Sequence, residues 1–153
     1  NLENIFISNH NRIVKKVHSS WNFLNNEKKH NIHLGTLKKT SFRTKRLDQI
    51  CSKFKKIDLI KIDVDGYELD VLKSGKKTVI KHKPPVYFEF APYLYKDFGY
   101  TAETLIKFIK NELNYEFYDK NLKKVKNINK LIKKLHNRSE NFFLLHESAK
   151  PGK

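Results

Sequence analysis

Hydrophobic residues follow two different spacings within one short stretch of the chain. Residues 57–64 read IDLIKIDV, a nearly continuous apolar run rich in β-branched residues. Such a run predicts a strand that is covered on both faces, as in a parallel sheet. Gly66 interrupts the run, after which Leu69, Val71 and Leu72 follow helical spacing. This stretch therefore predicts a strand, a tight turn and a helix.

The rest of the chain continues this alternation of strands and helices. Further strands are predicted near residues 4–7, 12–17, 37–44, 86–90, 115–118 and 141–146, with residues 122–125 extending or pairing with the strand before them. Further helices are predicted near residues 47–54, 76–82, 101–109 and 128–135. The last of these is amphipathic, and we interpret it as a core-facing helix with lysines outside rather than a membrane-surface or nucleic-acid element. The alternation predicts an α/β fold with a parallel sheet.

Composition indicates a single folded domain with a basic surface. Hydrophobic residues make up 39% of the 153 residues, and the net charge is +16. The four arginines are outnumbered by lysines spread along the chain, which favours a solvated lysine surface over a dedicated polyanion site. We therefore expect neither a specific nucleic-acid partner nor a membrane, although a lysine-rich nucleic-acid module stays an alternative.

The chain has no apolar run near the roughly 20 residues that span a bilayer. Cys51 is its single cysteine, so an internal disulfide is excluded, and we expect a reducing, cytoplasmic location. Cys51 is interpreted as a buried thiol. His30 and His33 are interpreted as surface residues, because nothing near them in the sequence completes a metal site.

Acidic residues gather where the central strand should end. Five of the 16 acids lie within residues 58–70, three of them at the predicted turn: Asp63, Asp65 and Glu68. Glu89 lies near the end of the next predicted strand, and Tyr93 follows in a tyrosine-rich loop. Ligands of open α/β sheets bind beyond the carboxyl ends of the strands, so we expect the chemistry here.

Several segments together resemble the FkbM-type methyltransferases. KIDVDGYE at residues 61–68, continuing into VL at 71–72, is similar to that family's K-I-D-V-E-G-x-E-x-x-V-L segment. RLD at 46–48, KPP at 83–85 leading to FE at 88–89, and NFFL at 141–144 also resemble family segments. The resemblance covers most of the chain from about residue 44 onward. It implies an S-adenosylmethionine-dependent enzyme that methylates hydroxyl oxygens, on a Rossmann-like, mostly parallel sheet with an antiparallel last strand.

The chain also departs from the family pattern. Asp65 stands where the family has glutamate, and no G-x-G occurs to form the glycine-rich turn that holds the cofactor. If residues 4–7 form the third strand of the family sheet, the first strand–helix units are lacking. On this reading, residues 1–146 are the carboxyl-terminal two thirds of a methyltransferase domain with a tail at 147–153, and cofactor binding by them alone should be weak.

The resemblance and the chemistry of methyl transfer suggest roles for the candidate residues. Asp63 is expected to orient the acceptor hydroxyl or act as base, beside the cofactor, with Asp65 assisting. Both also suit a purely structural role in holding the turn. Glu68, Glu89 and Tyr93 are expected to contact the acceptor, which is a small molecule or a glycan.

A second enzymatic interpretation uses the same residues. Asp63-Val64-Asp65 is a D-x-D at a strand end, which in metal-dependent glycosyltransferases binds a divalent cation. The Gly-x-Glu helix that follows fits the methyltransferase pattern better. We therefore expect no metal.

Overall fold

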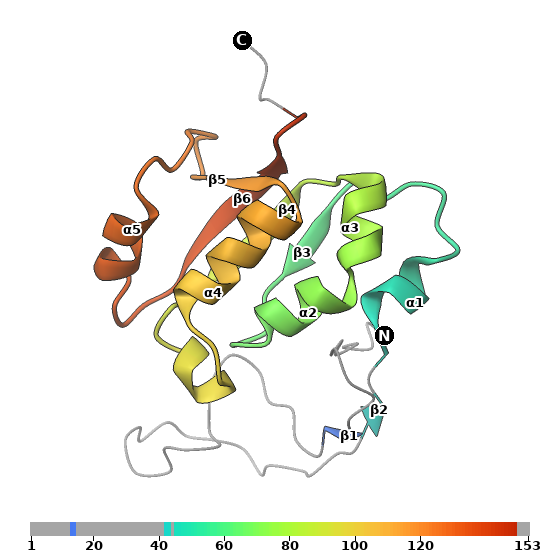
Figure 1. Ribbon diagram of the computed structural model, residues 1–153, viewed down its shortest axis with the longest axis horizontal. Coiled ribbons are helices and arrows are strands. Elements are labelled where there is room, and N and C mark those ends of the chain that lie inside the picture. Colours follow the sequence, from blue (N-terminus) through green and yellow to red (C-terminus); the bar gives the residue numbers. More distant parts are fainter. Residues whose placement is uncertain (1–12, 15–41, 44, 150–153) are drawn as a thin grey trace.

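The computed structural model describes residues 13–14, 42–43 and 45–149, and its centre is a four-stranded mixed sheet (Figure 1). The strand order is β3 (Ile60–Ile62), β4 (Val86–Phe90), β6 (Glu140–His146) and β5 (Tyr115–Tyr118). β3 is parallel to β4, while β6 is antiparallel to both of its neighbours. β3, β4 and β5 thus run in one direction, and the last strand runs against them. The α/β class and the reversed last strand are confirmed.

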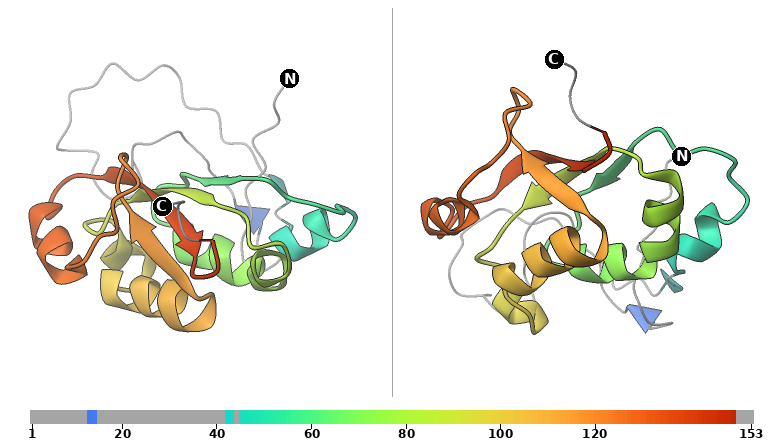
Figure 2. Two further views of the ribbon diagram at one scale, coloured as in Figure 1. Left: turned by 90° about the horizontal axis from the view of Figure 1, so that it is seen from above. Right: turned by 45° about the horizontal axis from the view of Figure 1, so that its top comes forward.

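Helices cover one face of this sheet. The helical elements are α1 (Leu47–Cys51), α2 (Glu68–Ser74), α3 (Lys76–His82), the 3-10 turn η1 (Tyr95–Phe98), α4 (Ala102–Lys107), the π-helical turn η2 (Phe108–Glu112) and α5 (Ile128–Lys134). α2 and α4 lie on the same face, while α1 and α5 lie at opposite ends of the molecule (Figure 2). None of the described helices is long and apolar enough to cross a membrane.

Some elements differ in extent from those predicted. α2 and α3 meet at Gly75, where an added Cβ would lie 2.4 Å from Leu47 Cδ2, so glycine lets α1 pack closely against the junction. β1 (Ile13–Val14) pairs antiparallel with β2 (Phe42–Arg43), short pieces of two predicted strands. The strand predicted at 4–7, and the two histidines predicted at the surface, lie outside the described residues.

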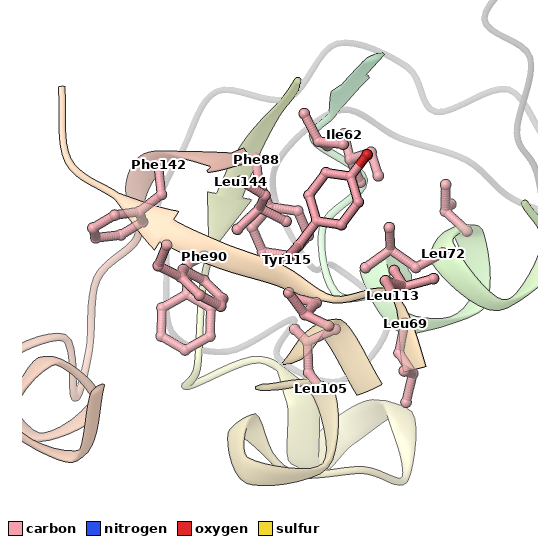
Figure 3. Close-up of a cluster of buried hydrophobic side chains, with 14 of the residues drawn as sticks. Ile62, Leu69, Leu72, Phe88, Phe90, Leu105, Leu113, Tyr115, Phe142 and Leu144 are labelled. Carbon is pink, nitrogen blue, oxygen red and sulfur yellow. The ribbon is translucent and has the colours of Figure 1, made fainter. Parts of the chain in front are cut away.

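Aromatic side chains from three strands form the centre of the core (Figure 3). Phe90 packs edge to face with Phe117 and Phe142, at centroid distances of 5.7 and 6.3 Å. Leu72 and Leu105 from the helical layer are fully buried in the same core. Burial of such side chains is the main favourable contribution to folding.

The central strand is covered less than its sequence predicts. Ile62 is buried, but Lys61 is exposed and the side chain of Leu59 is 56% exposed. The expectation of a strand covered on both faces is therefore wrong for the described residues. The described helices cover only one face of the sheet, so the other face of β3 has no helical layer over it within the described residues.

The elements after β5 agree with those predicted from the sequence. Residues 122–125 fold back on β5, with the Val125 amide donating to the Phe117 carbonyl at 2.8 Å. In α5, Leu131 is buried, as is Leu135 just after it, which confirms the core-facing interpretation of this helix. Cys51 is buried as expected, and burial raises the pKa of its thiol.

Candidate functional site

The parallel pairing of β3 with β4 brings the predicted acidic residues to one edge of the sheet. Ile62 is in register with Phe88, so Asp63 and Glu89 come next on neighbouring strands that run the same way. Asp63 directly follows β3, and Glu89 is the penultimate residue of β4. Both therefore lie at the carboxyl ends of parallel strands, where ligands of such sheets bind.

Three carboxyl groups converge at this edge. One carboxylate oxygen from each of Asp63, Asp65 and Glu89 lies within 4.8 Å of the others. Asp63 is exposed, while the other two are half-buried. We refer to these three residues as the carboxylate cluster. The structure thus brings together three of the residues that the sequence singled out.

Crowding and burial make part of this cluster easier to protonate. Partial burial raises the pKa of Asp65, and the charge of Asp63 raises it further. The pKa of Glu89 is also raised, chiefly by burial and then by the negative charges of Asp63 and Asp65, against the lowering effect of a hydrogen bond from Ser139. Glu89 is thus a better proton acceptor than an ordinary surface carboxylate.

Two polar neighbours hold the cluster in position. Lys61 Nζ lies 2.9 Å from Asp63 Oδ2 and forms an ion pair with it. Ser139 Oγ donates a hydrogen bond to Glu89 Oε1 at 2.7 Å. Sequence reasoning missed Ser139, because nothing in the sequence relates it to a residue 50 positions away.

The turn between β3 and α2 has a backbone that few residues adopt. Asp65 has φ of 50° and Gly66 has φ of 102°. A Cβ on Gly66 would lie 2.2 Å from the Phe98 ring, so the turn needs glycine for its conformation and for the close approach of that ring. The Tyr100 hydroxyl donates to the Gly66 carbonyl at 2.7 Å. The turn that carries Asp65 is therefore held rigidly from the η1 side.

Glu68 lies beneath this turn and apart from the carboxylate cluster. Its side chain is fully buried, and its Oε1 accepts long hydrogen bonds from the backbone amides of Val64 (3.4 Å) and Gly66 (3.3 Å). Burial raises the pKa of Glu68 to about 7, although these amides favour the charged form. The geometry gives Glu68 a role in holding the turn, and its contact with an acceptor stays a prediction.

The two tyrosines of the following loop have different environments. The Tyr93 side chain is 45% exposed, and its pKa is raised by partial burial and then by the charges of Glu89 and Asp65. The contact of Tyr93 with an acceptor stays a prediction. Tyr95 is fully buried, accepts a hydrogen bond from the Ala91 amide at 3.0 Å and stacks on Tyr100. It belongs to the core.

The carboxylate cluster offers oxygen atoms to two kinds of partner. Carboxylate oxygens accept hydrogen bonds from hydroxyl groups, and they are also the ligands that hard divalent cations prefer. Their charge is complementary to a positively charged methyl donor beside Asp63. The described residues contain no glycine-rich turn after a strand that would hold the remainder of such a donor.

Comparison with known proteins assigns the chain to a family. Neither the curated proteins nor the solved structures yielded a match. The family model "Methyltransferase FkbM domain" matches residues 3–117, which is most of the chain and includes β3, β4, the turn between β3 and α2, and the whole carboxylate cluster. The chain therefore belongs to the FkbM methyltransferase family.

Proposed function

We propose that this protein transfers a methyl group from S-adenosylmethionine to a hydroxyl oxygen of a sugar or another small metabolite. The observation that carries the proposal is the convergence of Asp63, Asp65 and Glu89 at the carboxyl ends of two parallel strands. Membership of the FkbM methyltransferase family supports the reaction class. The strand order with one reversed strand is consistent with a Rossmann-like methyltransferase sheet.

Two residues of the carboxylate cluster have different roles toward the acceptor hydroxyl. A hydroxyl group is a poor nucleophile until its proton is accepted, and the acceptor oxygen must also be aligned for in-line displacement. Glu89 is the better candidate for proton acceptor, because burial raises its pKa. Asp63, held by Lys61, is the better candidate for orienting the hydroxyl. The sequence left Asp63 open to either role, orienting the hydroxyl or acting as base, and the proposal takes the first.

The remaining residues support these two. S-adenosylmethionine, when bound, supplies the electrophilic methyl group. Asp65 raises the basicity of Glu89 through its charge, and Tyr93 offers an exposed ring against the acceptor. Ser139 and Glu68 act indirectly, the first by holding Glu89 and the second by holding the turn.

The proposal is tested by following labelled methyl transfer to a panel of sugars and small hydroxylated metabolites. We expect product labelled at oxygen with the unaltered protein. Glu89→Gln should reduce the rate by about 100-fold or more, since general-base catalysis contributes 10²–10⁴-fold. Asp58→Asn is a matched control, because Asp58 is exposed and outside the cluster. Equal rates for Glu89→Gln and the control, or label on nitrogen or carbon, would contradict the proposal.

A second candidate function rests on the same geometry. Three carboxylate oxygens within 4.8 Å of one another also suit a divalent cation, as in D-x-D glycosyltransferases that bind nucleotide-sugars. Calorimetric titration separates the two functions. Heat with S-adenosylmethionine supports methyl transfer, whereas heat only with a nucleotide-sugar and manganese supports glycosyl transfer.

A further inference from the structure

Positive charge is concentrated in one segment outside the carboxylate cluster. Residues 120–138 contain no acidic residue and eight basic ones: Lys120, Lys123, Lys124, Lys126, Lys130, Lys133, Lys134 and Arg138. This segment comprises the hairpin after β5, the helix α5 and the beginning of the connection to β6. We call these eight side chains the basic surface.

The fold turns these side chains outward. All eight basic residues are exposed. In α5, Leu131 packs into the core, while Lys130, Lys133 and Lys134 follow the i, i+3, i+4 spacing of one helix face. The apolar anchor of α5 therefore holds its lysines on an outer face.

Few of these charges are neutralised within the protein. Lys124 pairs with Glu116 at 3.3 Å, and Lys134 pairs with Glu140 at 3.2 Å. The other six form no ion pair with another described residue. The part of the chain outside the description contains only two acids, Glu3 and Glu27, so it cannot balance six cations one for one.

One exposed apolar side chain lies among the lysines of the basic surface. Leu122 is 47% exposed at the tip of the hairpin, between Lys120 and Lys123. Its φ of 56° lies in the left-handed region, which is uncommon for a residue of this kind. Asp119 Oδ1 accepts from the Asn121 and Lys123 amides at 2.8 and 2.9 Å and holds the turn in this form. The hairpin thus presents a leucine to solvent instead of burying it.

One end of the basic surface, at Arg138, lies next in the chain to a residue that contacts the carboxylate cluster. The hairpin follows the carboxyl end of β5, which runs in the same direction as β3 and β4 (Figure 1). At the far end of the segment, Ser139 follows Arg138 and donates to Glu89.

We propose that the basic surface docks the protein on an anionic lipid bilayer, with Leu122 entering the headgroup region. Lysines attract anionic headgroups, and an apolar side chain among them adds insertion into the interface. A nucleic acid fits less well, because only Arg138 in the segment has the planar fork that favours phosphate and base recognition. This proposal departs from the expectations of merely solvated lysines and of no membrane partner, and it does not depend on the reaction catalysed.

Sedimentation of the full chain with vesicles tests the proposal. We expect binding to mixed phosphatidylcholine–phosphatidylserine vesicles, little binding to pure phosphatidylcholine, and weakening as salt rises. The variant Lys120→Glu/Lys123→Glu/Lys126→Glu should bind at least about tenfold more weakly. Lys53→Glu/Lys55→Glu/Lys77→Glu is the matched control, with the same change in net charge on exposed lysines outside the basic surface.

A second variant separates insertion from charge. Leu122→Ser should weaken vesicle binding severalfold at high salt while leaving the circular dichroism spectrum unchanged, because the leucine is exposed. Equal losses in the two triple variants would overturn the proposal, since the effect would then follow net charge alone. Binding to duplex DNA without binding to anionic vesicles would overturn it in favour of a nucleic-acid surface.

Discussion

Ser139 Oγ donates a 2.7 Å hydrogen bond to Glu89 Oε1 across 50 residues of sequence. The antiparallel register of β6 on β4 accounts for the contact, because Glu140 is opposite Phe90 and Ser139 is therefore delivered to the carboxyl end of β4. The bond stabilises the charged form of a carboxyl group that burial and neighbouring acids make easier to protonate. Ser139 thus orients Glu89 and limits the rise in its pKa that burial causes.

Loss of the serine hydroxyl should make Glu89 easier still to protonate. Ser139→Ala removes the one hydrogen bond that lowers the pKa of Glu89, so this pKa should rise further above its ordinary value. Carbon-13 NMR titration of the glutamate carboxyl groups measures the change. Ser139→Thr keeps the hydroxyl and is the control. An unchanged pKa in Ser139→Ala would show that the bond does not persist in solution.

Loss of a negative neighbour should act in the opposite direction. Asp63→Asn removes a charge that raises the pKa of both Asp65 and Glu89, so both values should fall toward those of ordinary carboxyl groups. The same NMR titration follows both residues. Asp58→Asn, which removes an exposed acid outside the cluster, should shift neither value. A response to Asp58→Asn as large as that to Asp63→Asn would mean that the three carboxyl groups are not in contact.

Glu68 should make the stability of the protein fall as the pH rises toward neutrality. Its pKa is about 7 in the folded protein against 4.5 for an ordinary glutamate, so folding favours the protonated form. The associated stability is complete below about pH 4.5 and is lost as the pH rises through about 7. The difference between these two pKa values corresponds to about 3 kcal/mol in the free energy of unfolding.

Glu68→Gln isolates this contribution, because the neutral amide keeps an oxygen acceptor for the Val64 and Gly66 amides without titrating. Urea unfolding at pH 5 and pH 7.5 should show a smaller fall in the free energy of unfolding for this variant than for the unaltered protein. Glu147→Gln, at an exposed position, should keep the full fall. Identical falls in all three proteins would contradict the assignment to Glu68.

Two glycines with positive φ should differ sharply in their tolerance of alanine. Gly66→Ala adds a Cβ that would overlap the Phe98 ring, in addition to the strain at φ of 102°. We expect it to lower the free energy of unfolding by about 3 kcal/mol or more, combining backbone strain with overpacking. Gly99 has φ of 78° with open space around its Cβ position, so Gly99→Ala should cost only about 1 kcal/mol. Equal losses in chemical denaturation would show that Phe98 does not pack against the turn.

The sequence alone determined the elements around the site and their chemistry. The change from a β-type run to helical spacing at Gly66 predicts the strand, turn and helix that β3 and α2 form, and it places Asp63 and Asp65 at the strand end. The KIDVDGYE segment is enough to suggest the family that the match over residues 3–117 confirms. These inferences succeed because they depend on residues close together in the chain.

The tertiary structure alone decided which acids lie close together. Glu68 is only three residues from Asp65, yet helix geometry turns its carboxyl group under the turn, where the Val64 and Gly66 amides hold it. The pairing of β4 with β3 places Glu89 beside Asp63, and the pairing of β6 with β4 places Ser139 beside Glu89. No local sequence pattern specifies either pairing. The exposure of β3 has the same origin, because burial depends on which strands and helices become neighbours, and local spacing does not specify those neighbours.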